Sequence, residues 1–143
     1  MSDALRWFPD SMPVPSVGVH TAPWWEAAAE HRLVVQRCTA CGATRHPPAP
    51  VCWTCRSGDH AWVELPGTGS VFTFTRVHQA FVPALAEQLP YVVAAIDLDE
   101  GGGARLVSNV VDCDPNDVHI GMPVRVVWED IGPTLTLPRF TPR

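Results

Sequence analysis

Two pairs of cysteines carry the most specific chemistry of this sequence. Cys38 and Cys41 form one Cys-x-x-Cys pair, and Cys52 and Cys55 form a second pair after ten intervening residues. A two-residue spacer lets both sulfurs of a pair point at one site, and two facing pairs supply the tetrahedral sulfur cage that Zn²⁺ prefers. Gly42 follows the first pair and can adopt the positive φ that a tight turn around a metal needs. The spacing therefore predicts a four-thiolate zinc site.

Other chemistry stays open for the same cysteines. Four thiolates also suit a one-electron iron centre of the rubredoxin type. Disulfides are disfavoured, because the five cysteines are an odd number and residues 1–16 lack the features of a secretory leader. A site closed by four sulfurs leaves no position for a substrate, so zinc there would be structural. Three nearby histidines could replace a thiolate, but we interpret them as ordinary loop or surface residues: His31, His46 and His60.

Composition indicates a globular protein of one domain or two small ones. The chain has 143 residues, of which 46% are hydrophobic and 17% charged, as in folded domains. The longest apolar run, residues 91–96, is too short to span a bilayer, so we expect a cytoplasmic protein that binds no membrane. The net charge is −5, and nine of the fifteen carboxylates lie from Val71 onward. This balance disfavours tight binding to a nucleic-acid backbone.

The elements that must position the cysteines begin with an arm and a short helix over residues 1–32. Prolines interrupt the first part, which shows no sustained periodicity. Residues 21–30 then predict a helix, with Thr21 as its N-cap, a proline in its first turn and three consecutive alanines. Trp24 and Trp25 give this helix a large aromatic surface. One tryptophan can fill the core while the other covers it, or the two can dock a partner.

Residues 33–65 predict a small module built around the cysteine pairs. A strand over residues 33–37 leads into the first pair, and a strand over residues 61–65 closes the module. Three prolines stiffen the loop over residues 44–51 between the pairs. A module of about 30 residues is too small to hold a core unaided, so the metal must supply the missing stability.

Residues 66–143 predict a five-stranded β-barrel. Turn residues at 66–69 mark the boundary, and alternating hydrophobicity follows, with Phe72 and Phe74 on one face of the first strand. A short helical turn fits between the third and fourth strands. This count and spacing match the Greek-key barrel called the OB-fold. The expected strands cover residues 70–78, 91–98, 104–111, 124–128 and 134–137.

Several motifs together resemble one known family. They are the tryptophan-rich helix, Leu-Val-Val-Gln-Arg-Cys-Thr-Ala-Cys-Gly, Pro-Pro-Ala-Pro-Val-Cys, Gly-Thr-Gly-Ser-Val-Phe-Thr-Phe-Thr, Leu-Pro-Tyr-Val-Val-Ala, Ile-Gly-Met-Pro-Val-Arg-Val and a final Leu-Pro-Arg-Phe. From about Trp24 to Arg139, their order and spacing resemble the uncharacterised-domain family that joins a rubredoxin-like zinc ribbon to an OB-fold and accompanies acyl-CoA enzymes. The resemblance implies a mainly β, α+β fold with an N-terminal helix, the ribbon and the five-stranded barrel.

The resemblance also implies an accessory role beside another enzyme. Members of this family are usually non-catalytic partners of thiolase-like enzymes, including condensing enzymes and steroid side-chain aldolases, and they help to form an acyl-CoA channel. The four cysteines match the family's metal ligands. Zn²⁺ would be structural, and a CoA thioester would be a ligand shared with the partner enzyme. No catalytic residue carries over.

The residues themselves give little support to catalysis by this chain alone. Gly101–Gly103 separates two predicted strands and is typical of a hairpin turn rather than a phosphate-binding loop. A nucleophile, a base and an orienting group could be drawn from Ser108, His78, Asp97 and Cys113, but nothing in their spacing requires it.

Candidate contacts with the ligand and the partner lie at aromatic and cationic positions. Arg76 and His78 stand at the start of the loop between the first two barrel strands, where they could reach a CoA phosphate, and Phe81 lies in the same loop. An apolar partner surface is expected at Trp24, Trp25, Phe81 and a tail over residues 137–140.

A nucleic-acid-binding protein is the alternative function. OB-folds and zinc ribbons both commonly bind nucleic acids, and Phe72 and Phe74 could stack on bases. The acidic balance of the chain and the family resemblance favour the acyl-CoA partner over this alternative.

Overall fold

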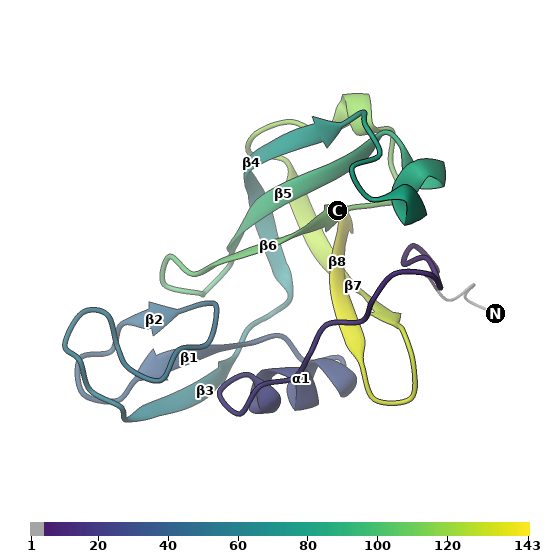
Figure 1. Cartoon of the computed structure of the whole chain (residues 1–143). Helices are drawn as coiled ribbons and strands as arrows, with labels where there is room; N and C mark the ends of the chain where they lie inside the picture. Colours follow the sequence, from purple (N-terminus) through teal and green to yellow (C-terminus); the bar gives the residue numbers. More distant parts are fainter. Residues whose placement is uncertain (1–4) are drawn as a thin grey trace.

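The computed structural model describes residues 5–143, which form a small three-stranded sheet, one α-helix and a closed β-barrel (Figure 1). The mainly β fold predicted from the sequence is confirmed. No helix within the described residues is long and apolar enough to cross a membrane. The elements are α1 (Ala22–Ala29), β1 (Val34–Cys38), β2 (Thr44–Arg45), β3 (His60–Glu64), β4 (Thr68–Val77), η1 (Pro83–Gln88), β5 (Tyr91–Leu98), β6 (Arg105–Val110), η2 (Pro115–Asp117), β7 (Pro123–Asp130) and β8 (Thr136–Pro142).

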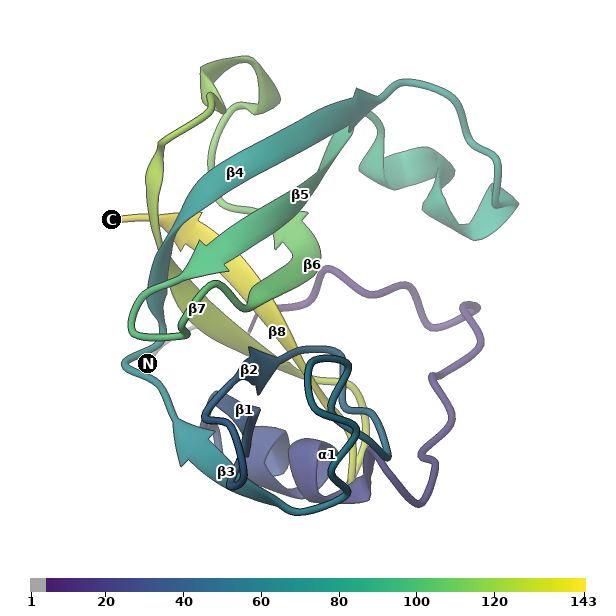
Figure 2. The same ribbon diagram turned by 90° about the vertical axis from the view of Figure 1, so that its left-hand side faces the viewer.

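The small sheet has the strand order β2-β1-β3 and is antiparallel throughout. β1 is the central strand, and it pairs with β3 along its whole length and with β2 through Gln36 and Arg45. β1 and β3 lie where strands were predicted, whereas β2 occupies the start of a segment expected to be a loop. Figure 2 shows this sheet and α1 below the barrel strands.

The barrel closes in the order β4-β5-β6-β8-β7. Neighbouring strands are antiparallel except for β6 and β8, which are parallel and pair at Val110 and Phe140. The helical turn η2 connects β6 to β7, between the third and fourth barrel strands, as the sequence predicted. The five-stranded OB-type barrel is therefore confirmed, with η1 as an additional turn in the loop between β4 and β5.

The prediction that Phe72 and Phe74 share one face of β4 is wrong. Val71 is buried, whereas Phe72 is 44% exposed and Phe74 packs only partly against the core. The register against β5 shifts between Val71 and Thr73. Such a bulge adds one residue to one strand, so the inward positions change from odd to even numbers along β4.

The last strand differs from the prediction in both place and length. β8 covers Thr136–Pro142 instead of residues 134–137, and its Phe140 is fully buried in the barrel. The tail over residues 137–140 is therefore a barrel strand and not a free apolar surface for a partner. Its prolines obscured the strand in the sequence. They are tolerated because β8 pairs with β6 at a single position, which leaves most of one strand edge without a hydrogen-bond ladder.

Helix α1 packs against both the small sheet and the barrel. Trp24 and Ala28 belong to one buried apolar cluster that also contains residues of β1 and of the barrel strands. The Trp24 ring stands edge-on to Trp25, with 4.8 Å between the ring centroids, so that Trp24 fills the core and Trp25 covers it. Thr21 occupies the predicted N-cap position, but its hydroxyl bonds to Gly18 and does not cap the helix.

A buried ion pair holds the N-terminal arm against the barrel. Glu129 on β7 and Arg139 on β8 are almost fully buried and are joined by hydrogen bonds of 3.0 and 3.1 Å. The other carboxylate oxygen of Glu129 accepts the backbone N–H groups of Trp7 and Phe8. The Arg139 guanidinium also lies over the Trp7 ring, 4.7 Å from its centroid. Figure 1 shows the arm passing beside β8 on its way to α1.

We expect Arg139→Met to lower the free energy of unfolding by about 3–5 kcal/mol, because it leaves the Glu129 charge buried without a cation. Guanidinium denaturation of the full chain measures this loss. Arg125→Met removes the same side chain at an exposed position of β7 and should change the stability by less than about 0.5 kcal/mol. Similar small losses for both variants would contradict the role assigned to the buried pair.

Candidate metal centre and the adjoining cleft

The two cysteine pairs lie in loops with the same backbone pattern. In the first loop, the N–H of Gly42 donates to the Cys38 carbonyl at 2.9 Å, and in the second, the N–H of Arg56 donates to the Cys52 carbonyl at 2.9 Å. Gly42 and Arg56 both have positive φ values, of 79° and 67°. The tight turn predicted at Gly42 is confirmed, since glycine adopts this conformation at little steric cost. The repeated turn directs both pairs of sulfurs to one place.

The four sulfurs form one compact cluster. The Sγ atoms of Cys38, Cys41, Cys52 and Cys55 all lie within 4.8 Å of one another. Cys38 and Cys55 are separated by 3.5 Å between Sγ atoms, and Cys41 and Cys52 by 3.7 Å. A tetrahedral site with Zn–S bonds of about 2.3 Å requires sulfur–sulfur edges of about 3.8 Å. The donor set and its spacing therefore fit a structural zinc ion, and we propose these four residues as its ligands.

Backbone N–H groups favour the thiolate form of the two buried cysteines. The N–H of Cys41 is the main cause that lowers the pKa of Cys38. The N–H groups of Cys55 and Thr54 lower the pKa of Cys52 to about 6. Because the thiolate and not the thiol is the metal ligand, these N–H groups prepare both buried sulfurs to hold a cation.

The loops that carry the cysteines contribute nothing to the main apolar cluster. No residue between Val35 and Trp62 belongs to this cluster, even among its partly buried members. Between them, the N–H of Ala49 donates to Oε1 of Gln36 at 2.9 Å, and Nη2 of Arg45 donates to the Ala49 carbonyl at 3.1 Å. These two bonds fasten the proline loop to the sheet. A segment of this kind needs a metal for much of its folding free energy.

The residues suggested as CoA contacts lie at the far end of the barrel, around the loop between β4 and β5. Arg76 donates hydrogen bonds to the carbonyls of Pro115, Asn116 and Val118, at 2.6 to 3.3 Å, so its guanidinium is engaged by the η2 turn and the residue after it. His78 is exposed, and Phe81 is 76% exposed. The contacts of these residues with a ligand stay predictions.

The residues considered for catalysis have other partners. Ser108 donates to the Pro138 carbonyl at 2.5 Å, and Asp97 pairs with Arg105 at 2.6 Å. Burial, followed by nearby aspartates, raises the pKa of the half-buried Cys113, which disfavours its thiolate. None of these contacts joins a nucleophile to a base.

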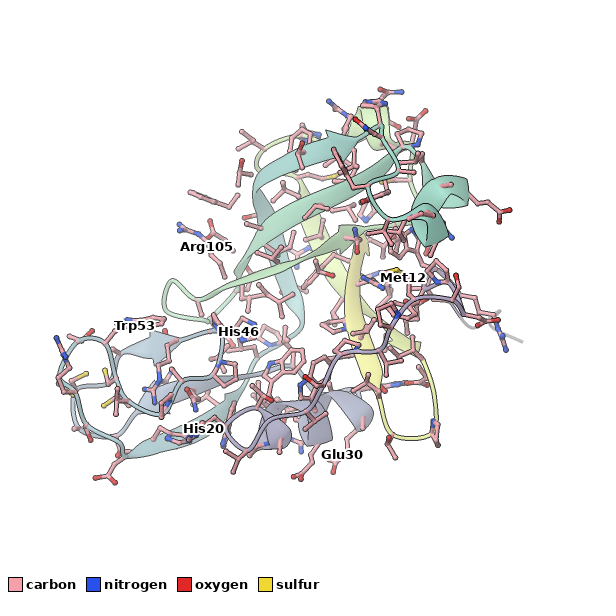
Figure 3. The ribbon with its side chains drawn as sticks, in the orientation of Figure 1. Met12, His20, Glu30, His46, Trp53 and Arg105 are labelled. Atoms are coloured by element: carbon pink, nitrogen blue, oxygen red, sulfur yellow. The ribbon has the colours of Figure 1, made fainter. Side chains whose placement is uncertain are left out.

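A cleft lies where α1, the proline loop and the barrel meet. Its volume is about 370 Å³, and Figure 3 shows His46 between the small sheet and the barrel. The rings of His46 and Trp24 stand 5.5 Å apart between centroids. The cleft is lined by Thr21, Trp24, Trp25, His46, Pro47, Pro48, Val93, Leu106, Val107, Ser108, Asn109, Leu137, Pro138 and Arg139.

His46 is not the ordinary loop or surface residue that the sequence suggested. Its Nδ1 is buried and has no hydrogen-bond partner within residues 5–143. Burial lowers its pKa to about 4 from 6.5, so the imidazole is neutral at pH 7. The sequence held no signal for this environment, because the cleft is made by three segments that are distant along the chain.

We expect the purified chain to hold one zinc ion, and Cys41→Ser to open the cysteine loops while the barrel stays folded, because those loops lack an apolar core. Elemental analysis and limited proteolysis check this, with the first cuts expected between residues 36 and 61. Stoichiometric iron would instead support an electron-transfer centre, and uniform digestion would show that sheet and barrel unfold as one unit. Cys113→Ser, outside the cluster, is the control and should keep the zinc.

The half-buried His46 should make the protein less stable in acid. The unfolded chain takes up a proton near pH 6.5, whereas the folded chain does so only near pH 4, so the stability contribution present above pH 6.5 is lost as the pH falls through this window. His46→Gln should lose less stability than the wild type between pH 7 and pH 5 in chemical denaturation. His119→Gln, at an exposed position, should follow the wild-type slope, and parallel slopes for all three proteins would contradict this role.

Comparison with known proteins matches both parts of the chain. Residues 25–61 match the family model described as the ChsH2 rubredoxin-like zinc ribbon domain, and residues 62–129 match that of the ChsH2 C-terminal OB-fold domain. The chain is similar to a probable enoyl-CoA hydratase alpha subunit of Thermomonospora curvata, with 46% identity over 130 residues. That match covers 91% of this chain but only 40% of the hydratase subunit, so this chain spans about two fifths of that relative.

Two further relatives match over most of their length. A DUF35 domain-containing scaffold protein of Methanocaldococcus jannaschii is 38% identical over 109 residues, which covers 76% of this chain and 75% of that protein. A solved structure titled Ltp2-ChsH2(DUF35) aldolase superposes with a TM-score of 0.80 at 46% identity, over 90% of this chain and 98% of that one. With the same zinc ribbon and OB-fold in the same order, this chain belongs to the DUF35 family.

Proposed function

We propose that this chain is a non-catalytic subunit that docks on a thiolase-like enzyme. The observation that carries the proposal is the similarity to the Ltp2-ChsH2(DUF35) aldolase structure, which extends over 98% of that chain at 46% identity. The archaeal relative is named a scaffold protein, which supports a role in assembly. The partner would be a thiolase, an acyl-CoA condensing enzyme or a steroid side-chain aldolase, and the chain would serve lipid or steroid metabolism.

The chemistry of the described residues supports a role without catalysis. Among residues 5–143, the four cysteines are the one group of three or more His, Cys, Asp or Glu side chains with metal-binding geometry. A site with four protein ligands is closed, so a metal there supplies stability and offers no position for substrate. The bond making or breaking would therefore belong to the partner enzyme.

Among the exposed or half-buried apolar side chains of residues 5–143, those in the loop between β4 and β5 and on α1 are the ones we assign to a partner. Phe81 is 76% exposed and Val82 is 41% exposed in the loop between β4 and β5, where neither contributes to the core. On α1, Trp25 is half-buried at the cleft, while the buried Trp24 supports its ring from the edge. We propose Trp25 and Phe81 as direct partner contacts, with Trp24 fixing the position of Trp25. Large aromatic side chains of this kind dominate binding energy at protein interfaces.

Acyl-CoA binding is part of the same proposal. A CoA thioester would lie between this chain and its partner, in contact with His78 and Phe81. Arg76 would fix the start of their loop through its bonds to residues 115–118, and its positive charge would attract the CoA phosphates from there. The mostly apolar cleft beside Trp25 suits the acyl portion.

One observation supports the alternative of nucleic-acid binding. The exposed Phe72 ring carries the Arg105 guanidinium 3.6 Å from its centroid, and an aromatic ring beside a cation is a common platform for a base. Asp97 pairs with the same arginine, and the chain has a net charge of −5. Both facts weaken attraction to a phosphate backbone.

We expect the chain to co-purify from its native host with a thiolase-like enzyme and to show no acyl-CoA turnover alone. Phe81→Ser and Trp25→Ala should each weaken binding to that enzyme by about 30-fold, the loss expected for an aromatic anchor worth about 2 kcal/mol. Calorimetry of the reassembled pair measures this effect. Ile120→Ser, which removes an apolar residue about as exposed as Phe81, should leave the affinity unchanged.

The same titrations test the acyl-CoA and nucleic-acid proposals. CoA should bind the isolated chain weakly and the assembled pair more tightly. Turnover by the isolated chain would contradict the accessory role. Tight, salt-sensitive binding of single-stranded RNA or DNA would support the alternative, because phosphate contacts weaken steeply with salt.

A further inference from the structure

Arg45 is a buried cation without a partner anion. It is 1% exposed, and it is among the largest fully buried side chains of the protein. Its Nη2 donates to the Ala49 carbonyl, whereas Nε and Nη1 are buried and have no hydrogen-bond partner within residues 5–143. No carboxylate forms an ion pair with it in the described chain.

This environment contrasts with that of the other buried arginine. Arg139 has the carboxylate of Glu129 at 3.0 Å and the amide oxygen of Asn109 at 2.6 Å. A buried ionised group is costly unless it is paired and hydrogen-bonded. One neutral carbonyl does not balance the charge of Arg45, so an anionic group nearby would lower the cost of burying it.

The sheet places Arg45 beside the cysteine cluster. Arg45 on β2 is opposite Gln36 on β1, and opposite residues of an antiparallel pair point to the same face. Cys38 follows Gln36 by two residues on β1, so it shares that face and lies roughly 7 Å further along the strand. The Ala49 backbone, which Arg45 holds, leads within three residues to Cys52. Arg45 is therefore enclosed between the sheet and the segment that delivers the second cysteine pair.

The cysteine cluster carries the negative charge that could balance the positive charge of Arg45. Four thiolates carry a charge of −4, and a divalent ion among them leaves a net charge of −2. We propose that the Arg45 guanidinium is the internal countercharge of the metal centre and stabilises its thiolates. This inference rests on the proposal that Cys38, Cys41, Cys52 and Cys55 hold zinc. It gives a reason for the burial of a cation in a segment that has no apolar core.

The test compares zinc affinity among full-length variants by competition with a chromophoric chelator. Arg45→Gln keeps a hydrogen-bond donor for Ala49 but removes the charge, and we expect zinc affinity to fall about tenfold or more, as for other residues that support metal ligands. Arg45→Lys keeps the charge and should retain most of the affinity. Arg37→Gln removes a charge from an exposed position on the opposite face of β1 and should have no effect. Gln36→Leu, which removes the other bond to Ala49 without changing charge, should weaken zinc binding less than Arg45→Gln.

Replacing zinc by cobalt adds a spectroscopic measurement that would not change if Arg45 served only in packing. Loss of a nearby positive charge raises the energy of the sulfur electrons, so the thiolate-to-cobalt charge-transfer band of Arg45→Gln should shift to longer wavelength while that of Arg45→Lys stays in place. Equal zinc affinities and an unshifted band in Arg45→Gln, or equal losses in Arg45→Gln, Arg45→Lys and Gln36→Leu, would overturn the proposal. A wild-type chain that holds no metal would overturn the metal assignment as well. The metal content of the wild type therefore separates failure of the Arg45 proposal from failure of the zinc assignment.

Discussion

The segment between Gln36 and Ala61 depends on the four sulfurs because, apart from strand pairing and a few side-chain hydrogen bonds, it has no apolar core to hold it. No member of the main apolar cluster lies within it, and its two short loops close through backbone bonds that bring Cys38, Cys41, Cys52 and Cys55 together. A small module without an apolar core folds only when metal–ligand bonds supply the missing free energy. Its buried polar side chains are consistent with this constraint, since Gln36 and Arg45 face the proline loop where a larger domain would place aliphatic residues.

The rest of the chain is held together by apolar burial. One cluster runs from Trp24 on the helix through β1 into the barrel, where Phe140 is fully buried. The Glu129–Arg139 pair fixes the N-terminal arm on the same barrel. These contacts join the helix, the small sheet and the barrel through one buried apolar cluster. The exposed or half-buried aromatic side chains at Trp25 and Phe81 are better suited to recognise another protein than to act on a substrate, which agrees with the role we propose.

The sequence by itself determined the features that depend on local spacing. Two-residue spacers and two-residue periodicity are local properties of the chain. A few neighbouring residues were therefore enough to predict the Cys-x-x-Cys site, the glycine turn after the first pair and the alternating strands. The order of helix, ribbon and barrel followed from these local signals. The family resemblance added the expected partner, and the comparisons support the family assignment.

Tertiary structure alone decided the features that depend on distant segments. The bulge at Phe72 could not be predicted from the residues of β4, because the register of β4 is defined by its pairing with β5. β8 was masked by its prolines, which are acceptable because its neighbour β6 pairs with it at a single position. Nothing near Arg45 or His46 in the sequence predicted the burial of the Arg45 side chain or of the His46 Nδ1 atom, because the groups that enclose a side chain are brought to it by folding. Burial, pairing and unbalanced charge are properties of that enclosure, and they exist only once the chain has closed.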